Sequence, residues 1–147
     1  LSKEFFEKVN EQVLLMDNVA IMNLVKTVTK SCEVSGEELH VMLNLRAQKR
    51  LDFILIDIRE MYEYSESSIK GTDMLLPTST IHLHMDELKK LSSKLLIFYC
   101  HTAGRTAQMI FILRRMGFLN IAHLSGGIAK YHGEKLKNAP LPKNIRF

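Results

Sequence analysis

Apolar residues recur at spacings of three and four over residues 3–29, which is the period of one face of an α-helix. The stripe consists of Phe5, Phe6, Val9, Val13, Met16, Ala20, Leu24 and Val28. It predicts one amphipathic helix, or two helices separated near Asp17 and Asn18. Such a stripe has two interpretations: it covers part of the domain that follows, or it forms the interface of a homodimer.

Short apolar runs alternate with helical segments through the rest of the chain. Ser35 and Glu38 form a capping box that predicts a helix from Glu37 to about Lys49. Continuous apolar runs predict buried strands at residues 53–57 and 95–99, because neither run leaves a face for water. Further strands are expected at residues 72–75 and 121–124, and further helices at 60–66, 85–91, 106–116 and 127–135. Gly117 should end the helix before it, with Phe118 making the hydrophobic contact of a Schellman motif.

This alternation predicts an α/β fold with a parallel sheet that is covered by helices on both faces. The last eleven residues contain Pro140 and Pro142 and predict an extended, solvated tail. No internal repeat is present in the sequence.

Composition narrows the class of protein. Hydrophobic residues make up 46% of the 147 residues and charged residues 24%, which is ordinary for a globular domain. No apolar run approaches the ~20 residues of a membrane span, and Glu4, Glu7 and Glu11 interrupt the start of the chain as no secretory signal would. We therefore expect a soluble, cytoplasmic protein without a membrane partner.

The charge pattern and the cysteines exclude further classes. The net charge is +4, the basic residues are dispersed and Trp is absent, so we expect no nucleic-acid partner. A mild positive field favours a small anionic substrate instead. Two cysteines without a Cys-x-x-Cys pair argue against a disulfide framework and a zinc site.

One loop combines groups that act together on an anion. It contains Cys100, His101, Thr102, Ala103, Gly104, Arg105 and Thr106. Cys100 ends a predicted strand and a helix follows, so several backbone N–H groups and the positive end of the helix should face one small concavity. With the Arg105 guanidinium they favour a thiolate, which makes Cys100 a candidate nucleophile. Gly104 is expected to supply the tight turn.

Each cysteine also has a structural interpretation, because a thiol at the end of a buried strand is commonly an inert small hydrophobe. From the chemistry alone, the two interpretations of Cys100 remain open. Cys32 precedes a helix cap without a basic companion. We interpret it as structural, the alternative being a resolving or sulfur-relay thiol.

Four segments in order resemble the rhodanese-like domain family. The Cys-x4-Arg-Thr loop is similar to its active-site loop, and residues 34–39 are similar to the start of its opening helix. Residues 55–60 match its Asp-x-Arg-Glu segment, and residues 116–128 its Gly-Phe and Leu-x-Gly-Gly-Ile ending. The resemblance implies a five-stranded parallel sheet. It divides the chain into an N-terminal helical extension (1–31), a rhodanese-like domain (32–136) and a C-terminal tail (137–147).

The resemblance also implies a function. A Cys100 thiolate would take sulfane sulfur from a donor such as thiosulfate and pass it to cyanide, a thiol or a protein acceptor. The amides from His101 to Thr106 and the Arg105 side chain would hold the persulfide, and Asp57 and Arg59 would brace the loop. Neither a metal nor an organic cofactor is implied.

Two alternatives and two departures accompany this resemblance. A phosphatase or arsenate reductase on the same fold would have five residues between Cys and Arg, whereas this chain has four. A non-catalytic binding or regulatory module is the other alternative. Ser68 replaces a His common in the family, and Tyr131 stands where Trp is common; both are interpreted as changes in packing.

Overall fold

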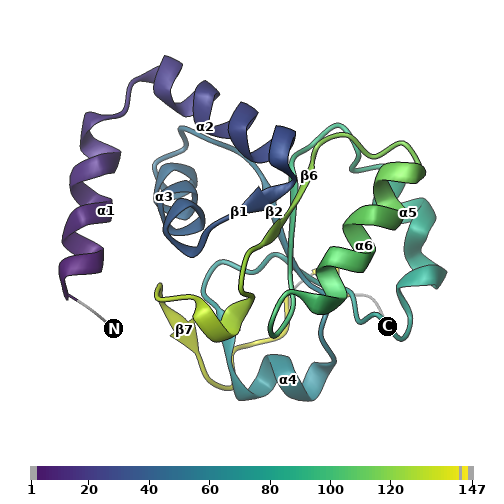
Figure 1. Ribbon diagram of the computed structural model, residues 1–147. Helices are drawn as coiled ribbons and strands as arrows, with labels where there is room; N and C mark the ends of the chain where they lie inside the picture. The colour runs from purple at the N-terminus through teal and green to yellow at the C-terminus, as the bar shows by residue number, and fades with distance from the viewer. Residues whose placement is uncertain (1–2, 143, 146–147) are drawn as a thin grey trace.

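The structure is a computed structural model that describes residues 3–142 and 144–145. A parallel sheet divides it, with α2 and α3 against one face, α1 packed outside α3, and α5 and α6 against the other face (Figure 1). The order of strands in the sheet is β1-β6-β5-β2-β4-β8, and every neighbouring pair is parallel. No described helix is long and apolar enough to cross a bilayer.

The central strands are the apolar runs of the sequence. They are β2 (Ile54–Asp57), β5 (Leu96–Tyr99) and β6 (Ile121–Leu124), with β1 (Glu33–Val34) and β4 (Met74–Leu75) beside them. The predicted α/β class and five-stranded parallel sheet are confirmed by these strands. Although no local pattern indicated β1, its pairing with β6 places it in this sheet.

Helices cover the two faces with separate apolar clusters. On one face lies α3 (Gly36–Ala47); on the other lie α5 (Met85–Lys89) and α6 (Gly104–Arg115). The capping box of Ser35 and Glu38 is present at the start of α3. At the end of α6, the Phe118 N–H donates to the Leu113 carbonyl and Gly117 has a φ of 95°, which confirms the Schellman motif.

The N-terminal extension is two helices, α1 (Lys3–Leu15) and α2 (Asn18–Ser31). They separate where predicted, because the Asp17 carboxylate caps α2 by accepting from the Ala20 N–H. Val9 and Val13 are buried in a cluster with α3 residues of the same chain, so the stripe covers the domain. A homodimer through this segment stays a prediction.

The C-terminal tail contributes a strand that the sequence did not predict. Its strand β8 (Asn144–Ile145) pairs with β4 and adds a sixth strand to the sheet. Tyr64 donates its hydroxyl hydrogen to the Pro140 carbonyl, which fastens the tail to α4 (Met61–Glu66). Residues 137–142 are exposed or half-buried, so the solvated tail stays a prediction.

The prediction of a helix at residues 127–135 is wrong. The chain forms a short 3-10 turn, η2 (Ile128–Lys130), and then β7 (Lys135–Leu136), which pairs antiparallel with β3 (Ser68–Ile69). Gly127 has a φ of 64°, outside the helical region. The remaining short element is the 3-10 turn η1 (Ile81–His84), which leads into α5.

Candidate active site

Cys100 lies directly after the central strand β5, at the carboxyl edge of the sheet where the sequence places it. Its side chain is 1% exposed and belongs to the apolar cluster on the α5 and α6 face. A thiol so deeply placed is sheltered from bulk water, and only a small or deeply inserted reagent can reach it.

The loop after Cys100 turns sharply into α6. Ala103 makes the turn with a φ of 82°, and α6 begins at Gly104. The prediction that Gly104 supplies the turn is wrong, since Gly104 is the first helical residue and a Cβ there would meet no atom within 4 Å. The left-handed conformation costs a residue with a side chain about 1–2 kcal/mol, so the loop holds Ala103 in a strained state.

The backbone N–H groups of this loop have no backbone partner in the described part of the chain. Across residues 3–142, none of the N–H groups from His101 to Thr106 donates a hydrogen bond to another part of the backbone. The side chain of Arg105 is partly exposed, whereas His101, Thr102 and Gly104 are open to solvent. Donors at the start of a helix favour negative charge, as the sequence predicted for this loop.

A second segment, whose role sequence analysis missed, fixes the loop from beneath. The Ile128 N–H donates to the Cys100 carbonyl, and the Ala129 N–H donates to the His101 carbonyl, each at 3.0 Å. A Cβ on Gly127 would lie 2.2 Å from the His101 carbonyl oxygen, so the two backbones meet without room for a side chain. The double glycine after a strand was the available signal for such a close approach.

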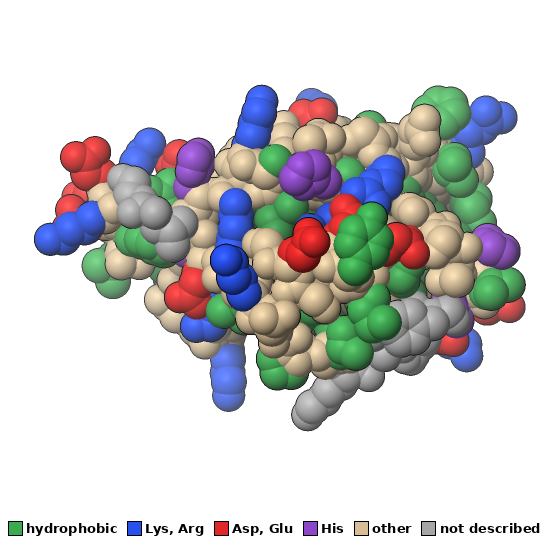
Figure 2. All heavy atoms as spheres, turned by 90° about the horizontal axis from the view of Figure 1, so that it is seen from below, with side chains coloured by type: hydrophobic (Ala, Val, Ile, Leu, Met, Phe, Trp, Pro, Cys, Tyr) green, Lys and Arg blue, Asp and Glu red, His purple; other side chains and the backbone are tan. Residues whose placement is uncertain are grey.

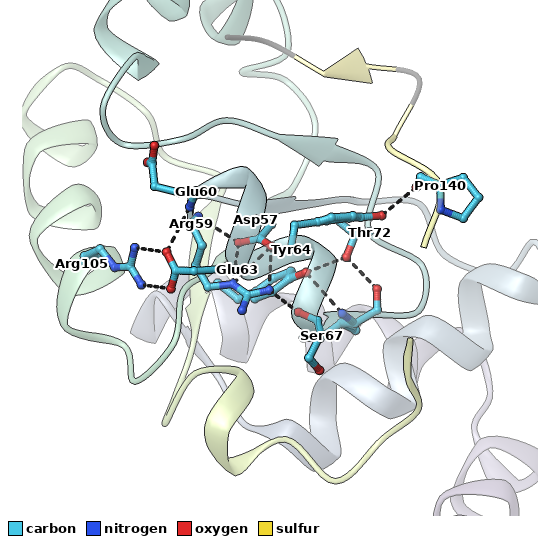
Figure 3. A network of polar contacts seen from close by, with 11 residues as sticks. Asp57, Arg59, Glu60, Glu63, Tyr64, Ser67, Thr72, Arg105 and Pro140 are labelled. Atoms are coloured by element: carbon cyan, nitrogen blue, oxygen red, sulfur yellow. Dashed lines mark hydrogen bonds and ion pairs between the residues drawn. The ribbon is translucent and has the colours of Figure 1, made fainter. Parts of the chain in front are cut away.

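Arg105 is held by a residue that the sequence analysis did not single out. The Glu63 carboxylate of α4 accepts two hydrogen bonds from the Arg105 guanidinium, and Nη1 and Nη2 each lie 2.9 Å from one of its oxygens (Figure 3). The hydrogen bonds from Arg105 hold the pKa of Glu63 below its ordinary value, although burial opposes them. No sequence spacing links residues 42 positions apart, so only the fold reveals this pair.

The Glu63–Arg105 pair should make stability depend on pH. Because the folded-state pKa of Glu63 is depressed, its contribution is present above the ordinary value of 4.5 and is lost as the pH falls through the folded-state value. Glu63→Gln keeps the oxygen that accepts from the Glu60 N–H but removes the charge. We expect it to lower the free energy of unfolding by about 0.5–1 kcal/mol at neutral pH, because the pair is partly exposed.

Urea unfolding of the parent and Glu63→Gln at neutral pH and at pH ~4 measures this difference. The gap between the two should shrink at the lower pH. A gap that stays constant would mean that the charge of Glu63 contributes nothing.

Asp57 and Arg59, to which the resemblance assigns a bracing role, form a buried ion pair. Arg59 donates through Nε and Nη2 to the Asp57 carboxylate, and through Nη2 to the Ser67 carbonyl (Figure 3). Burial raises the pKa of the Asp57 carboxyl, and the hydrogen bonds from Arg59 oppose that rise. The Arg59 guanidinium also lies 5.5 Å from the centre of the Tyr99 ring, which precedes Cys100.

The two departures from the family pattern lie in packed positions. Ser68 is fully buried in β3, and Tyr131 is 2% exposed with its hydroxyl 3.3 Å from Nδ1 of His40. Both side chains belong to the interior, as their interpretation as packing changes requires.

Cys32 is distant from Cys100 in the sheet. Cys32 precedes β1 and is level with Ile97 of β5, which lies two strands away. Cys100, in contrast, follows the end of β5. The two strand spacings and the three residues along β5 together separate Cys32 from Cys100 by more than ~10 Å. Arg114 of α6 donates a hydrogen bond to the Cys32 sulfur at 2.9 Å. In this conformation Cys32 cannot resolve a bond at Cys100.

A groove with a volume of about 340 Å³ lies beside the loop, lined in part by His101, Arg59, Glu63, Glu66 and Lys135. Figure 2 views this end of the molecule and shows acidic side chains near its centre with basic and histidine side chains beside them. The groove is therefore of mixed charge, not uniformly basic.

Comparisons with known proteins agree with this architecture. The Rhodanese-like domain family matches residues 37–134. The chain is 30% identical over 95 residues to a tRNA uridine(34) hydroxylase of Hamiltonella defensa, covering 61% of this chain and 26% of that protein. It is 31% identical over 77 residues to a probable adenylyltransferase/sulfurtransferase MoeZ of Mycobacterium tuberculosis, covering 52% and 19%.

Among solved structures, a rhodanese-related protein from Thermoplasma volcanium has a TM-score of 0.55 at 23% identity, covering 71% of this chain and 96% of that one. This likeness concerns the fold. The chain thus spans about a quarter or less of the two curated relatives and nearly all of the solved one. With its matched segment enclosing the Cys100 loop, Glu63 and Gly127, the chain belongs to the rhodanese-like domain family.

Proposed function

We propose that the protein is a sulfurtransferase that carries sulfane sulfur on Cys100. The observation that supports the proposal is the loop itself: Cys100 follows β5, α6 begins four residues later at Gly104, and the N–H groups from His101 to Thr106 have no backbone partner in the described chain. An anionic persulfide is the species that such donors stabilise best.

The reaction consists of two displacements. The Cys100 thiolate attacks the sulfane sulfur of a small anionic donor such as thiosulfate, whose S–S bond breaks as sulfite leaves with the electron pair. The persulfide anion then gives its outer sulfur to a thiophilic acceptor, which is cyanide in an assay or a thiol or protein in the cell. The acceptor forms the new bond to sulfur, and the thiolate is restored. Covalent catalysis of this kind needs no metal or organic cofactor.

Loop size supports sulfur transfer over phosphate chemistry. Four residues separate Cys100 from Arg105. A tetrahedral oxyanion needs a wider ring of amides than a single sulfur atom does, so we expect negligible hydrolysis of p-nitrophenyl phosphate. Deep burial of Cys100 favours a second candidate, a non-catalytic binding module, because a sheltered thiol reacts slowly.

Intact mass spectrometry after incubation with thiosulfate tests the proposal. The parent should gain one sulfur atom, about 32 Da, and lose it on addition of cyanide. Cys100→Ser should gain nothing, and Cys32→Ser should behave as the parent does. A parent whose mass does not change would support the binding module and overturn the proposed activity.

A further inference from the structure

Behind Cys100, three polar side chains follow one another through the interior. The Thr106 hydroxyl oxygen lies 3.6 Å from the Cys100 sulfur and 2.8 Å from Nδ1 of His123. On the other side of the imidazole, Nε2 lies 4.0 Å from a carboxylate oxygen of Glu33. Cys100, Thr106 and His123 are buried, whereas the Glu33 carboxylate is exposed to solvent.

The fold creates this alignment from four elements, β5, α6, β6 and β1. His123 is paired with Phe98 of β5 in the sheet, and Thr106 lies in the first turn of α6 above them. Glu33 pairs with His123 from the opposite neighbour, β1. The alignment therefore leads from the thiol, through the sheet edge formed by β6 and β1, to water.

Hydrogen-bond chemistry gives this alignment a direction. A threonine hydroxyl both donates and accepts, so it can accept from the thiol while it donates to an unprotonated Nδ1. When the proton has moved, both bonds reverse: Nδ1–H donates to the Thr106 oxygen, and the Thr106 hydroxyl donates to the thiolate. The Ala103 carbonyl, 3.1 Å from the same hydroxyl, can accept a hydrogen bond but cannot take the proton.

Two opposing effects act on His123. Burial lowers the pKa of its imidazole, while the charge of the Glu33 carboxylate opposes that fall and stabilises an imidazolium. Thr106 faces the ring from α6, with the Cys100 sulfur on the other side of its hydroxyl. Arg114 of α6 is engaged with the Cys32 sulfur.

We propose that His123 is a positioning residue that takes the proton of the Cys100 thiol through the Thr106 hydroxyl and thereby supplies the nucleophilic thiolate. The S–H bond of Cys100 breaks, the Thr106 oxygen accepts that proton as its own hydroxyl proton passes to Nδ1, and a thiolate and an imidazolium result. The imidazolium keeps this proton, with Nε2 4.0 Å from the Glu33 carboxylate, and the resulting ion pair holds Cys100 in the thiolate form. This inference rests on the proposed function, for which the thiolate is the attacking group.

The test measures thiolate, not sulfur transfer. The ultraviolet absorbance of the thiolate is recorded as a function of pH for each protein. The same measurement on that protein carrying the additional substitution Cys100→Ser is then subtracted, which leaves the signal of Cys100 without that of Cys32. At neutral pH we expect Thr106→Val and His123→Asn each to lower the thiolate fraction by about tenfold. In His123→Asn, a side-chain amide that forms hydrogen bonds but does not titrate replaces the Nδ1 end of the imidazole. In Thr106→Val, a methyl group of similar shape replaces the hydroxyl.

Three further variants separate a proton path from packing. Thr106→Ser keeps the hydroxyl and should retain the parent titration. The double variant Thr106→Val with His123→Asn should lose no more than either single variant, since both interrupt one path. His82→Asn replaces an exposed histidine outside the site and serves as the matched control.

Unchanged titrations in Thr106→Val and His123→Asn, or losses that add in the double variant, would overturn the proton path. A different result would contradict the proposed function. A parent that never acquires sulfur but whose thiolate falls in both variants would contradict sulfur transfer and leave the path intact.

Discussion

Gly127→Ala is expected to reduce sulfur transfer by about 100-fold or more, because displacements near 1 Å at a reacting centre cost that much. A Cβ at this position would lie 2.2 Å from the His101 carbonyl oxygen and 2.7 Å from the Thr102 nitrogen. Both contacts are with backbone, which cannot rotate away as a side chain would. The loop that presents its amides around Cys100 must therefore move.

The same substitution should also lower stability. Alanine at a φ of 64° carries the left-handed penalty in addition to the clash, and we expect a total loss of about 2–4 kcal/mol in the free energy of unfolding. Assays of sulfur transfer to cyanide and urea unfolding measure the two effects. Gly36→Ala is the control, since its Cβ would meet Tyr131 at an ordinary 3.5 Å. A Gly127→Ala enzyme as active as this control would show that the contact with the loop does not matter.

Arg59→Leu is expected to destabilise the protein by about 3–5 kcal/mol, because it leaves the Asp57 carboxylate buried without its partner. Asp57 is fully buried and Arg59 is 3% exposed, so water cannot replace the lost hydrogen bonds. The Ser67 carbonyl loses its donor as well. Urea unfolding at neutral pH measures the effect, provided that the variant still folds.

The pH dependence of this variant identifies the cause. Without the Arg59 guanidinium, burial raises the pKa of Asp57 further, against only the Tyr99 hydroxyl and the backbone N–H of residue 59, so the folded state favours the protonated carboxyl. A raised folded-state pKa gives stability that is present below the unfolded value, 3.8, and lost as the pH rises. The destabilisation relative to the parent should therefore shrink toward pH ~4. Adding Asp57→Asn should recover part of the loss at neutral pH. A deficit that is equal at both pH values would indicate lost packing in place of an unpaired charge.

The sequence predicted the elements whose cause is local. Continuous apolar runs identified β2 and β5, and caps at Ser35 and Gly117 identified the ends of two helices, because those signals lie within a few neighbouring residues. The strands β1 and β8 have two residues each, too few for a periodic pattern, and both exist through pairing with distant segments.

The candidate site divides in the same way. The Cys100 loop, with Arg105 and Thr106, lies in one stretch of chain and was found from its chemistry. Glu63 and His123 reach it only through the fold, so no spacing in the sequence pointed to them. Helical periodicity at residues 127–135 misled the prediction, because the amides of Ile128 and Ala129 bond to the loop and not to a preceding turn.

Those two bonds have a consequence for the order in which the protein matures. The loop is anchored by amides that follow it by 28 residues in the chain. During synthesis, Cys100 therefore leaves the ribosome well before the segment that shapes its surroundings. The two bonds that anchor the loop can form only after residue 129 has been synthesised and has docked, when most of the domain is already present.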